Sequence, residues 1–230
     1  MSDDRAVLTS DDPVASAPQR WQPVMRSPIS AIHQQQGAQL SLADGWEVPR
    51  RYRDVERERT AIRDTLGIAD ITARGKIDIR GAVGSALAGL APLEGAIPAR
   101  LSRSWVLVMT PAAAVAQSLE RITRAAPAKA MVTDATSIYA SIALLGPRVD
   151  DLLGRLISVD PSMLKPGSGL ATQMLRVPAI LVRRELPVSV VETYVAAELG
   201  RYVWEALFDI ARPVAPEPVG WDALRAEGWH

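Results

Sequence analysis

The longest apolar run in the chain, around Ile138–Leu145, has the length of a strand and is far too short for a membrane-spanning helix. Similar short runs recur along the chain, and several are separated by segments whose apolar residues have helical spacing. The strands that this pattern predicts are 39–42, 76–80, 104–109, 131–133, 139–145, 172–176, 180–184 and 189–195. Strand pairs mixed with strand–helix units indicate an α+β fold of two interlocked ferredoxin-like α/β halves, which meet near residue 135.

The helices expected between these strands are 29–37, 50–66, 81–90, 111–125, 149–157 and 197–210, with a short helix near the end of the chain. Pro111 suits a first helical turn, where its missing N–H has no partner to lose. We expect Gly67 to end the charged helix in a left-handed conformation. The predicted organisation is a flexible tail (1–26), a first half (27–134), a second half (135–211) and a Pro-rich linker with a terminal helix (212–230).

The composition excludes several classes of function. The chain has no cysteine, which excludes disulfides, thiolate metal ligands and a cysteine nucleophile. Its two histidines, His33 and His230, form no ligand pair, so we expect no metal site. The 26 basic and 26 acidic side chains cancel, which argues against nucleic-acid binding and leaves association with a partner protein unopposed by charge. The acidic start lacks the features of a secretion signal, so we expect a cytoplasmic protein outside the membrane.

Familiar catalytic patterns are missing or have simpler explanations. Gly81–Gly84 lacks the Gly-x-Gly-x-x-Gly spacing of a dinucleotide site, and there is no Gly-x-Ser-x-Gly elbow. The Asp150-Asp151 pair suits a helix N-terminus, where the helix dipole stabilises carboxylates. Trp221 and Trp229 lie beside the Pro-rich segment, where a partner surface and core packing are both plausible roles.

Six segments in a fixed order carry a resemblance to a known family. Residues 27–49 contain His33, then a Gly-Ala pair, then Gly45-Trp46 and Pro49 before a charged helix. The other segments are 59–81, 139–148, 191–195, 204–207 and 222–228. Together they span about residues 27–229, and the chain resembles the aminomethyltransferases of the glycine cleavage system.

This resemblance implies a folate-binding fold of two α+β domains followed by a C-terminal β-barrel. It also implies transfer of an aminomethyl-derived one-carbon unit to tetrahydrofolate. Related folds occur as a non-catalytic subunit of heterotetrameric sarcosine oxidase. We expect the barrel to be absent here, because the chain stops where it would begin.

The chain departs from the family where the chemistry should be. The loop that carries the family's catalytic Asp corresponds to Pro92–Leu101, which contains no Asp, so we expect no catalytic residue. The family's pterin-binding Glu falls on Val188, and Glu192 or Glu185 would have to replace it. With Arg225, these two carboxylates are the residues expected to bind any tetrahydrofolate.

Three hypotheses follow from these matches and departures. The first is a non-catalytic subunit of a one-carbon or amine-oxidising complex, bound to a larger oxidoreductase or transferase subunit through Trp221 and Trp229. The second is an active tetrahydrofolate-dependent aminomethyl or methyl transferase whose acids have moved. The third is an interaction scaffold unrelated to folate, since a fold does not determine a function.

Overall fold

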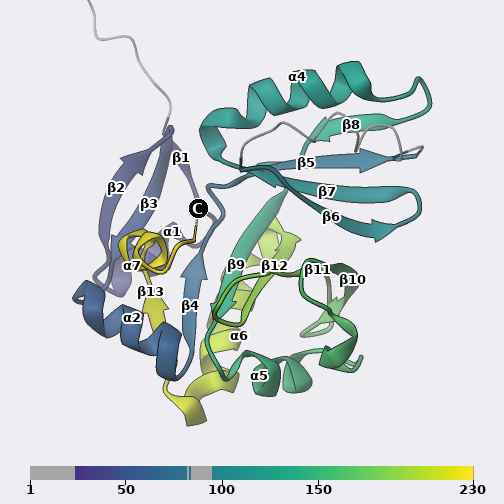
Figure 1. Ribbon diagram of the computed structural model, residues 1–230. Coiled ribbons are helices and arrows are strands. Elements are labelled where there is room, and N and C mark those ends of the chain that lie inside the picture. The colour runs from purple at the N-terminus through teal and green to yellow at the C-terminus, as the bar shows by residue number, and fades with distance from the viewer. Residues whose placement is uncertain (1–23, 82, 84–94, 230) are drawn as a thin grey trace, which may run out of the picture.

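The computed structural model describes residues 24–81, 83 and 95–229. Their strands form a three-stranded, a six-stranded and a four-stranded sheet (Figure 1). The mixed α+β architecture that the sequence pattern predicts is therefore confirmed.

The four-stranded sheet has the strand order β6-β7-β5-β8, and every neighbouring pair is antiparallel. Its strands are β5 (Gly75–Arg80), β6 (Ile97–Ser102), β7 (Trp105–Thr110) and β8 (Met131–Asp134). Helix α4 (Val115–Ala125) lies across it, and Pro111 precedes the 3₁₀ turn Ala112–Ala114 that leads into this helix (Figure 1). This strand order is that of a ferredoxin-like unit. The helix expected at 81–90 lies almost wholly outside the described residues.

The six-stranded sheet contains strands from both predicted halves of the chain. Its order is β10-β11-β12-β9-β4-β13, and only the last pair is parallel. The strands are β4 (Gly67–Asp70), β9 (Tyr139–Leu145), β10 (Gly169–Met174), β11 (Val177–Arg183), β12 (Val190–Ala196) and β13 (Glu217–Val219). Strand β4 comes from the first half, yet it pairs with β9 of the second half.

The six-stranded sheet is covered on both faces. On one face, helices α1 (Ser30–Gln35), α5 (Val149–Leu156) and α6 (Gly200–Ala211) contribute to a large apolar cluster around the buried Trp204. On the other face, Ile180, Val182 and Tyr194 pack against Leu107 and neighbouring apolar residues of the four-stranded sheet. The two larger sheets therefore share a buried interface.

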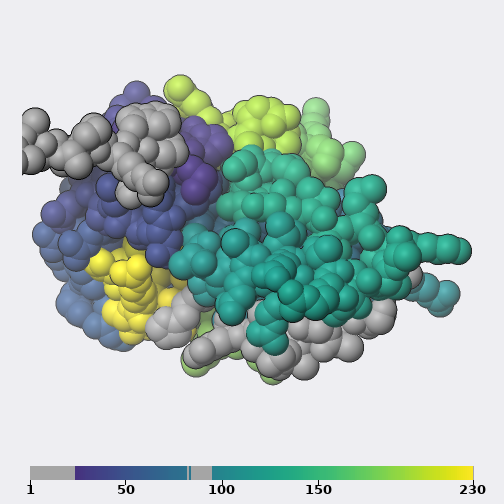
Figure 2. All heavy atoms as spheres, turned by 90° about the horizontal axis from the view of Figure 1, so that it is seen from above, coloured from purple at the N-terminus to yellow at the C-terminus, as the bar shows by residue number. Residues whose placement is uncertain are grey.

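The three-stranded sheet consists of β1 (Met25–Arg26), β2 (Gln39–Ala43) and β3 (Trp46–Arg51). Helix α7 (Trp221–Ala226) packs against β3 and α2 (Val55–Asp64). Figure 2 shows this C-terminal segment, in yellow, lying against the N-terminal third of the chain. The last helix thus lies beside elements that precede it by more than a hundred residues.

Three local expectations were wrong. The helix expected from Arg50 begins at Val55, because 46–51 form β3 and the Asp54 carboxylate accepts from the Arg57 N–H as an N-cap. Gly67 does not adopt a left-handed conformation and is the first residue of β4. The segment expected as a linker contains β13. None of the described helices is long and apolar enough to cross a membrane.

Candidate functional site

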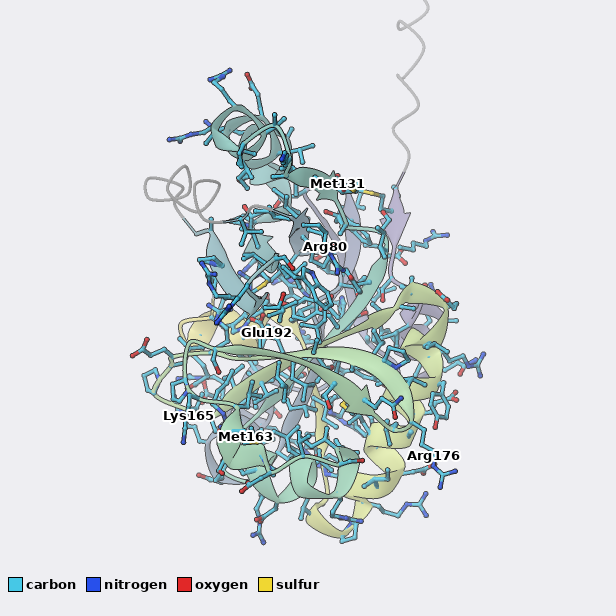
Figure 3. All side chains as sticks on the ribbon, turned by 90° about the vertical axis from the view of Figure 1, so that its right-hand side faces the viewer. Arg80, Met131, Met163, Lys165, Arg176 and Glu192 are labelled. Carbon is cyan, nitrogen blue, oxygen red and sulfur yellow. The ribbon has the colours of Figure 1, made fainter. Side chains whose placement is uncertain are left out.

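A fully buried carboxylate, Glu192, lies in the middle strand β12 between the two larger sheets (Figure 3). Its Oε1 atom accepts hydrogen bonds from Arg74 Nη1 at 2.9 Å and from Arg184 Nη1 at 2.5 Å. Its Oε2 atom accepts from the Tyr194 hydroxyl at 2.5 Å. Both carboxylate oxygens are therefore engaged by side chains of the chain itself.

Each partner of Glu192 has a simple structural origin. Tyr194 is two residues further along β12, so strand alternation places both side chains on the same face. Arg184 directly follows β11, and Arg74 lies in the turn between β4 and β5. Burial and the Glu192 charge raise the pKa of Tyr194 well above its usual value. The hydroxyl therefore stays protonated and donates to the carboxylate.

A cavity of about 210 Å³ lies beside this cluster, with Arg74 in its wall. The Arg74 guanidinium is 4.8 Å from the centre of the Trp229 ring, a cation–π contact. Trp221 meets Trp229 edge to face at 5.9 Å and 86°, and Arg225 lies 5.8 Å from the Trp221 ring. Asp44, in the turn between β2 and β3, also lines the cavity. The site thus combines two cations and two indoles with one carboxylate.

A second buried polar chain runs through the neighbouring elements. The Tyr52 hydroxyl and His33 Nδ1 are 2.7 Å apart, and His33 Nε2 is 2.7 Å from Asp70 Oδ2. Burial raises the pKa of the Asp70 carboxyl, but hydrogen bonds from His33, Ser27 and Thr72 outweigh it and leave this pKa lowered. These hydrogen bonds connect His33 of α1 with Tyr52, which directly follows β3, and with Asp70 of β4.

Lys76 is a fully buried lysine of β5. Its ammonium donates to the carbonyl oxygens of Thr72 at 2.8 Å and Tyr139 at 3.3 Å. Burial lowers its pKa to about 7 and outweighs the nearby Asp70 carboxylate, which acts in the opposite direction. The group therefore changes its protonation state near neutral pH.

The structure brings together some of the predicted site residues and not others. Glu192 touches Arg74, which lines the same cavity as Arg225. Glu185 is exposed in the turn that joins β11 to β12. The sequence did not identify Arg74 and Tyr194 as site residues. The alternation along β12 points to Tyr194, but no local pattern identifies Arg74.

Trp221 and Trp229, the two residues expected at a partner interface, are largely covered by the chain itself. Trp229 is only 3% exposed and packs into an apolar cluster with Leu224 and Val219. Trp221 is partly buried, and its Nε1 donates to the carbonyl oxygen of Asp70 at 3.0 Å. Both indoles line the cavity, and their contacts hold α7 against the rest of the chain.

Among the described residues, no three His, Asp or Glu side chains gather as a metal ion would require.

No protein-family model matches the chain. Curated aminomethyltransferases do match it, from Streptomyces avermitilis (28% identity over 86% of this chain) and Saccharopolyspora erythraea (29% over 88%). A solved structure of glycine cleavage system aminomethyltransferase T from Bartonella henselae has a TM-score of 0.74 at 19% identity, over 89% of this chain and 62% of its own.

Sequence and fold both resemble those of the aminomethyltransferases. The chain spans 61% and 63% of the length of the two curated relatives. It also matches a chain of the heterotetrameric sarcosine oxidase from Corynebacterium sp. U-96, solved with pyrrole 2-carboxylate. That match has a TM-score of 0.61 at 15% identity and covers 85% of this chain and 98% of the other.

The aminomethyltransferase resemblance implies tetrahydrofolate, but the described residues do not fit a pterin. The N–H groups of a pterin require a carboxylate acceptor, and Glu192 already accepts three hydrogen bonds, which leaves only about one of its roughly four acceptor positions. Val188 offers no acceptor, and its side chain packs against an apolar cluster. The cavity of about 210 Å³ is also below the roughly 300–1,000 Å³ of pockets for drug-sized ligands.

Proposed function

We propose that this chain is a non-catalytic subunit of a complex that oxidises amines or transfers one-carbon units. The proposal rests on the hydrogen bonds that the Glu192 carboxylate already accepts within the chain. Two guanidinium groups neutralise this carboxylate, and a hydroxyl group donates to its remaining oxygen. A general base or a pterin acceptor needs open acceptor positions, and three of the roughly four positions on this carboxylate are already occupied.

The comparisons support the same proposal. The fold extends over 98% of a chain from a heterotetrameric sarcosine oxidase, an enzyme built of different subunits. Residues 92–101, to which the family resemblance assigns the position of a catalytic Asp, contain no Asp in this sequence. A subunit that only supports a catalytic partner needs neither a catalytic Asp nor a carboxylate that can bind a pterin.

The test has two arms, which use the full chain. In the first, the chain is co-expressed with the flavin-dependent amine oxidase subunits of its own organism. We expect one stoichiometric complex by size-exclusion chromatography with light scattering, and oxidase activity that falls when the chain is left out. A chain that stays separate from every such subunit would contradict the proposal.

In the second arm, the purified chain is assayed for methylenetetrahydrofolate formation, and we expect none above background. Losing one acid–base group typically costs about 10²–10⁴-fold in rate. The matched variants are Glu192→Gln and Glu185→Gln, since the second carboxylate is exposed. Turnover by the wild type that Glu192→Gln abolishes and Glu185→Gln preserves would instead establish an active transferase.

A further inference from the structure

A second cavity, of about 640 Å³, lies at the edge of the interface between the four-stranded and six-stranded sheets. Trp105, the first residue of β7, lines it from the four-stranded sheet. Ala171, Pro178 and Ala196 line it from β10, β11 and β12 of the six-stranded sheet. All four residues are exposed or partly exposed, so a bound molecule can reach them. This cavity shares no described lining residue with the one beside Arg74.

Strand alternation explains the floor of this cavity. Ile180 of β11 and Tyr194 of β12 are paired, and both are buried against the four-stranded sheet. Pro178 lies two residues before Ile180, and Ala196 lies two residues after Tyr194, so both share that face of the six-stranded sheet. The floor that a ligand can touch is therefore a sheet face of small apolar side chains.

The walls of the cavity include two aromatic rings. Trp105 Nε1 donates to Asp78 Oδ1 at 2.6 Å, so the polar atom of this indole is already paired. The Arg80 guanidinium stacks 3.6 Å from the centre of the Trp105 ring and pairs with Asp78 at 3.0 Å, which balances its charge locally. Tyr139, which is partly exposed and pairs with Ala196, adds the second ring. Trp105 therefore offers a ligand its ring carbons.

The charge at the cavity indicates the sign of the ligand. Glu198 is the one charged residue among the described lining residues, and it is exposed. Arg201, three residues further on, pairs with Glu205. An ammonium group can donate to the Glu198 carboxylate, and aromatic rings also attract a cation. An anionic ligand would find no balancing cation among the described lining residues.

We infer that this cavity binds a small amine with an aromatic or branched apolar body. The ammonium group donates to the Glu198 carboxylate, while the apolar body lies against Trp105, Tyr139 and the small side chains of the floor. The volume falls within the roughly 300–1,000 Å³ of small-ligand pockets. An amino acid carries a carboxylate beside its amine and should bind less tightly. This site goes beyond the proposed function, because binding belongs to the isolated chain and requires no partner subunit.

The test is calorimetric titration of the full chain with phenethylamine, supported by tryptophan fluorescence. Phenethyl alcohol is the neutral probe of the same shape, and free phenylalanine adds a carboxylate to the amine. Because Glu198 is exposed, we expect phenethylamine to bind only about two- to fivefold more tightly than phenethyl alcohol. Phenylalanine should bind less tightly than phenethylamine.

Glu198→Gln is the decisive variant, because it should remove the preference for phenethylamine and leave the binding of phenethyl alcohol unchanged. A misfolded protein would instead lose both probes. The matched control is Glu120→Gln, which makes the same charge change at an exposed position of α4 outside the cavity and should keep the preference.

Ala171→Phe should fill the cavity and abolish the binding of both probes. Ala171 is exposed on β10, the edge strand of its sheet, so the larger side chain has room without disturbing the core.

Three results would overturn the inference. The first is no binding of phenethylamine at about 10 mM. The second is phenethylamine binding that is no tighter than that of phenethyl alcohol or of phenylalanine. The third is a preference for phenethylamine that survives Glu198→Gln, or binding that Ala171→Phe leaves unchanged. None of these results would bear on complex formation, so the proposed function is tested separately.

Discussion

At the scale of single residues, two buried ionisable groups are held by different kinds of partner. Glu192 and Lys76 are both fully buried, yet their surroundings differ. Glu192 accepts from two cationic partners, which stabilise its charge. Lys76 instead donates to neutral oxygens, and its burial lowers its pKa by more than the nearby Asp70 carboxylate raises it. Burial therefore disfavours the protonated, charged form of Lys76 and makes this side chain easy to deprotonate.

The lowered pKa of Lys76 predicts a pH-dependent stability. The folded pKa is about 7, while an unfolded lysine holds its proton up to about 10.4. Between these values the unfolded state binds more protons, so the contribution of Lys76 to stability rises with pH. The free energy of unfolding of the wild type, relative to Lys76→Met, should therefore increase by up to about 1.4 kcal/mol per pH unit above pH 7.

Urea denaturation of both proteins between pH 6 and 9.5, at intervals of about 0.5 unit, measures this difference. Lys129→Met is the control, because Lys129 is exposed and its difference from the wild type should stay constant. Below pH 7, Lys76 is protonated in both states and the difference should level off. Parallel curves for the wild type and Lys76→Met across this range would contradict the low pKa.

At the scale of elements, strands with long apolar runs were predictable and short paired strands were not. Strand β9 coincides with its predicted range, 139–145, because it is buried almost throughout and reads as an apolar run. Strands β4 and β13 are four and three residues long. Each is held by pairing with a distant segment, Glu217–Val219 on Gly67–Ala69, which no local pattern reveals.

The pairing of β4 with β13 predicts that Gly67 cannot carry a side chain. A Cβ atom there would lie 2.7 Å from Val219 Cγ2 and 3.1 Å from Ile62 Cγ1. Gly67→Ala should therefore lower the free energy of unfolding by about 1–3 kcal/mol, because the packed neighbours must move. Chemical denaturation measures the loss.

Gly154→Ala is the matched control for this variant. Gly154 lies in helix α5, and nothing stands within 4 Å of a Cβ added there. Alanine is the better helix former, so this substitution should stabilise the protein by about 0.5–1 kcal/mol. A stabilising or neutral Gly67→Ala would show that β13 does not pack on β4 as described.

At the scale of the whole molecule, the candidate site exists only because distant segments meet. Arg74 follows β4, Glu192 comes from β12, and the two indoles come from the C-terminal segment that packs against β3 and α2. The sequence pointed to Glu192 and Arg225 through a family resemblance. It could not show that Arg74 reaches Glu192, because 118 residues separate them. It also could not show that Trp229 is buried, since residue type alone fits a core or an interface.

The last prediction concerns the C-terminal segment as part of the fold. Removing residues 217–230 would take β13 from the sheet and would take Val219, Leu224 and Trp229 out of an apolar cluster. Each large buried side chain contributes about 1.5–3 kcal/mol, so the loss approaches the roughly 5–15 kcal/mol by which a whole domain is stable. We therefore expect the truncated chain to lose its cooperative unfolding transition, as followed by circular dichroism in urea. Trp229→Phe is the control, because it keeps an aromatic ring in the cluster and should retain cooperative unfolding. A truncated chain with the urea midpoint of the full chain would instead mean that this segment only docks on a fold that is complete without it.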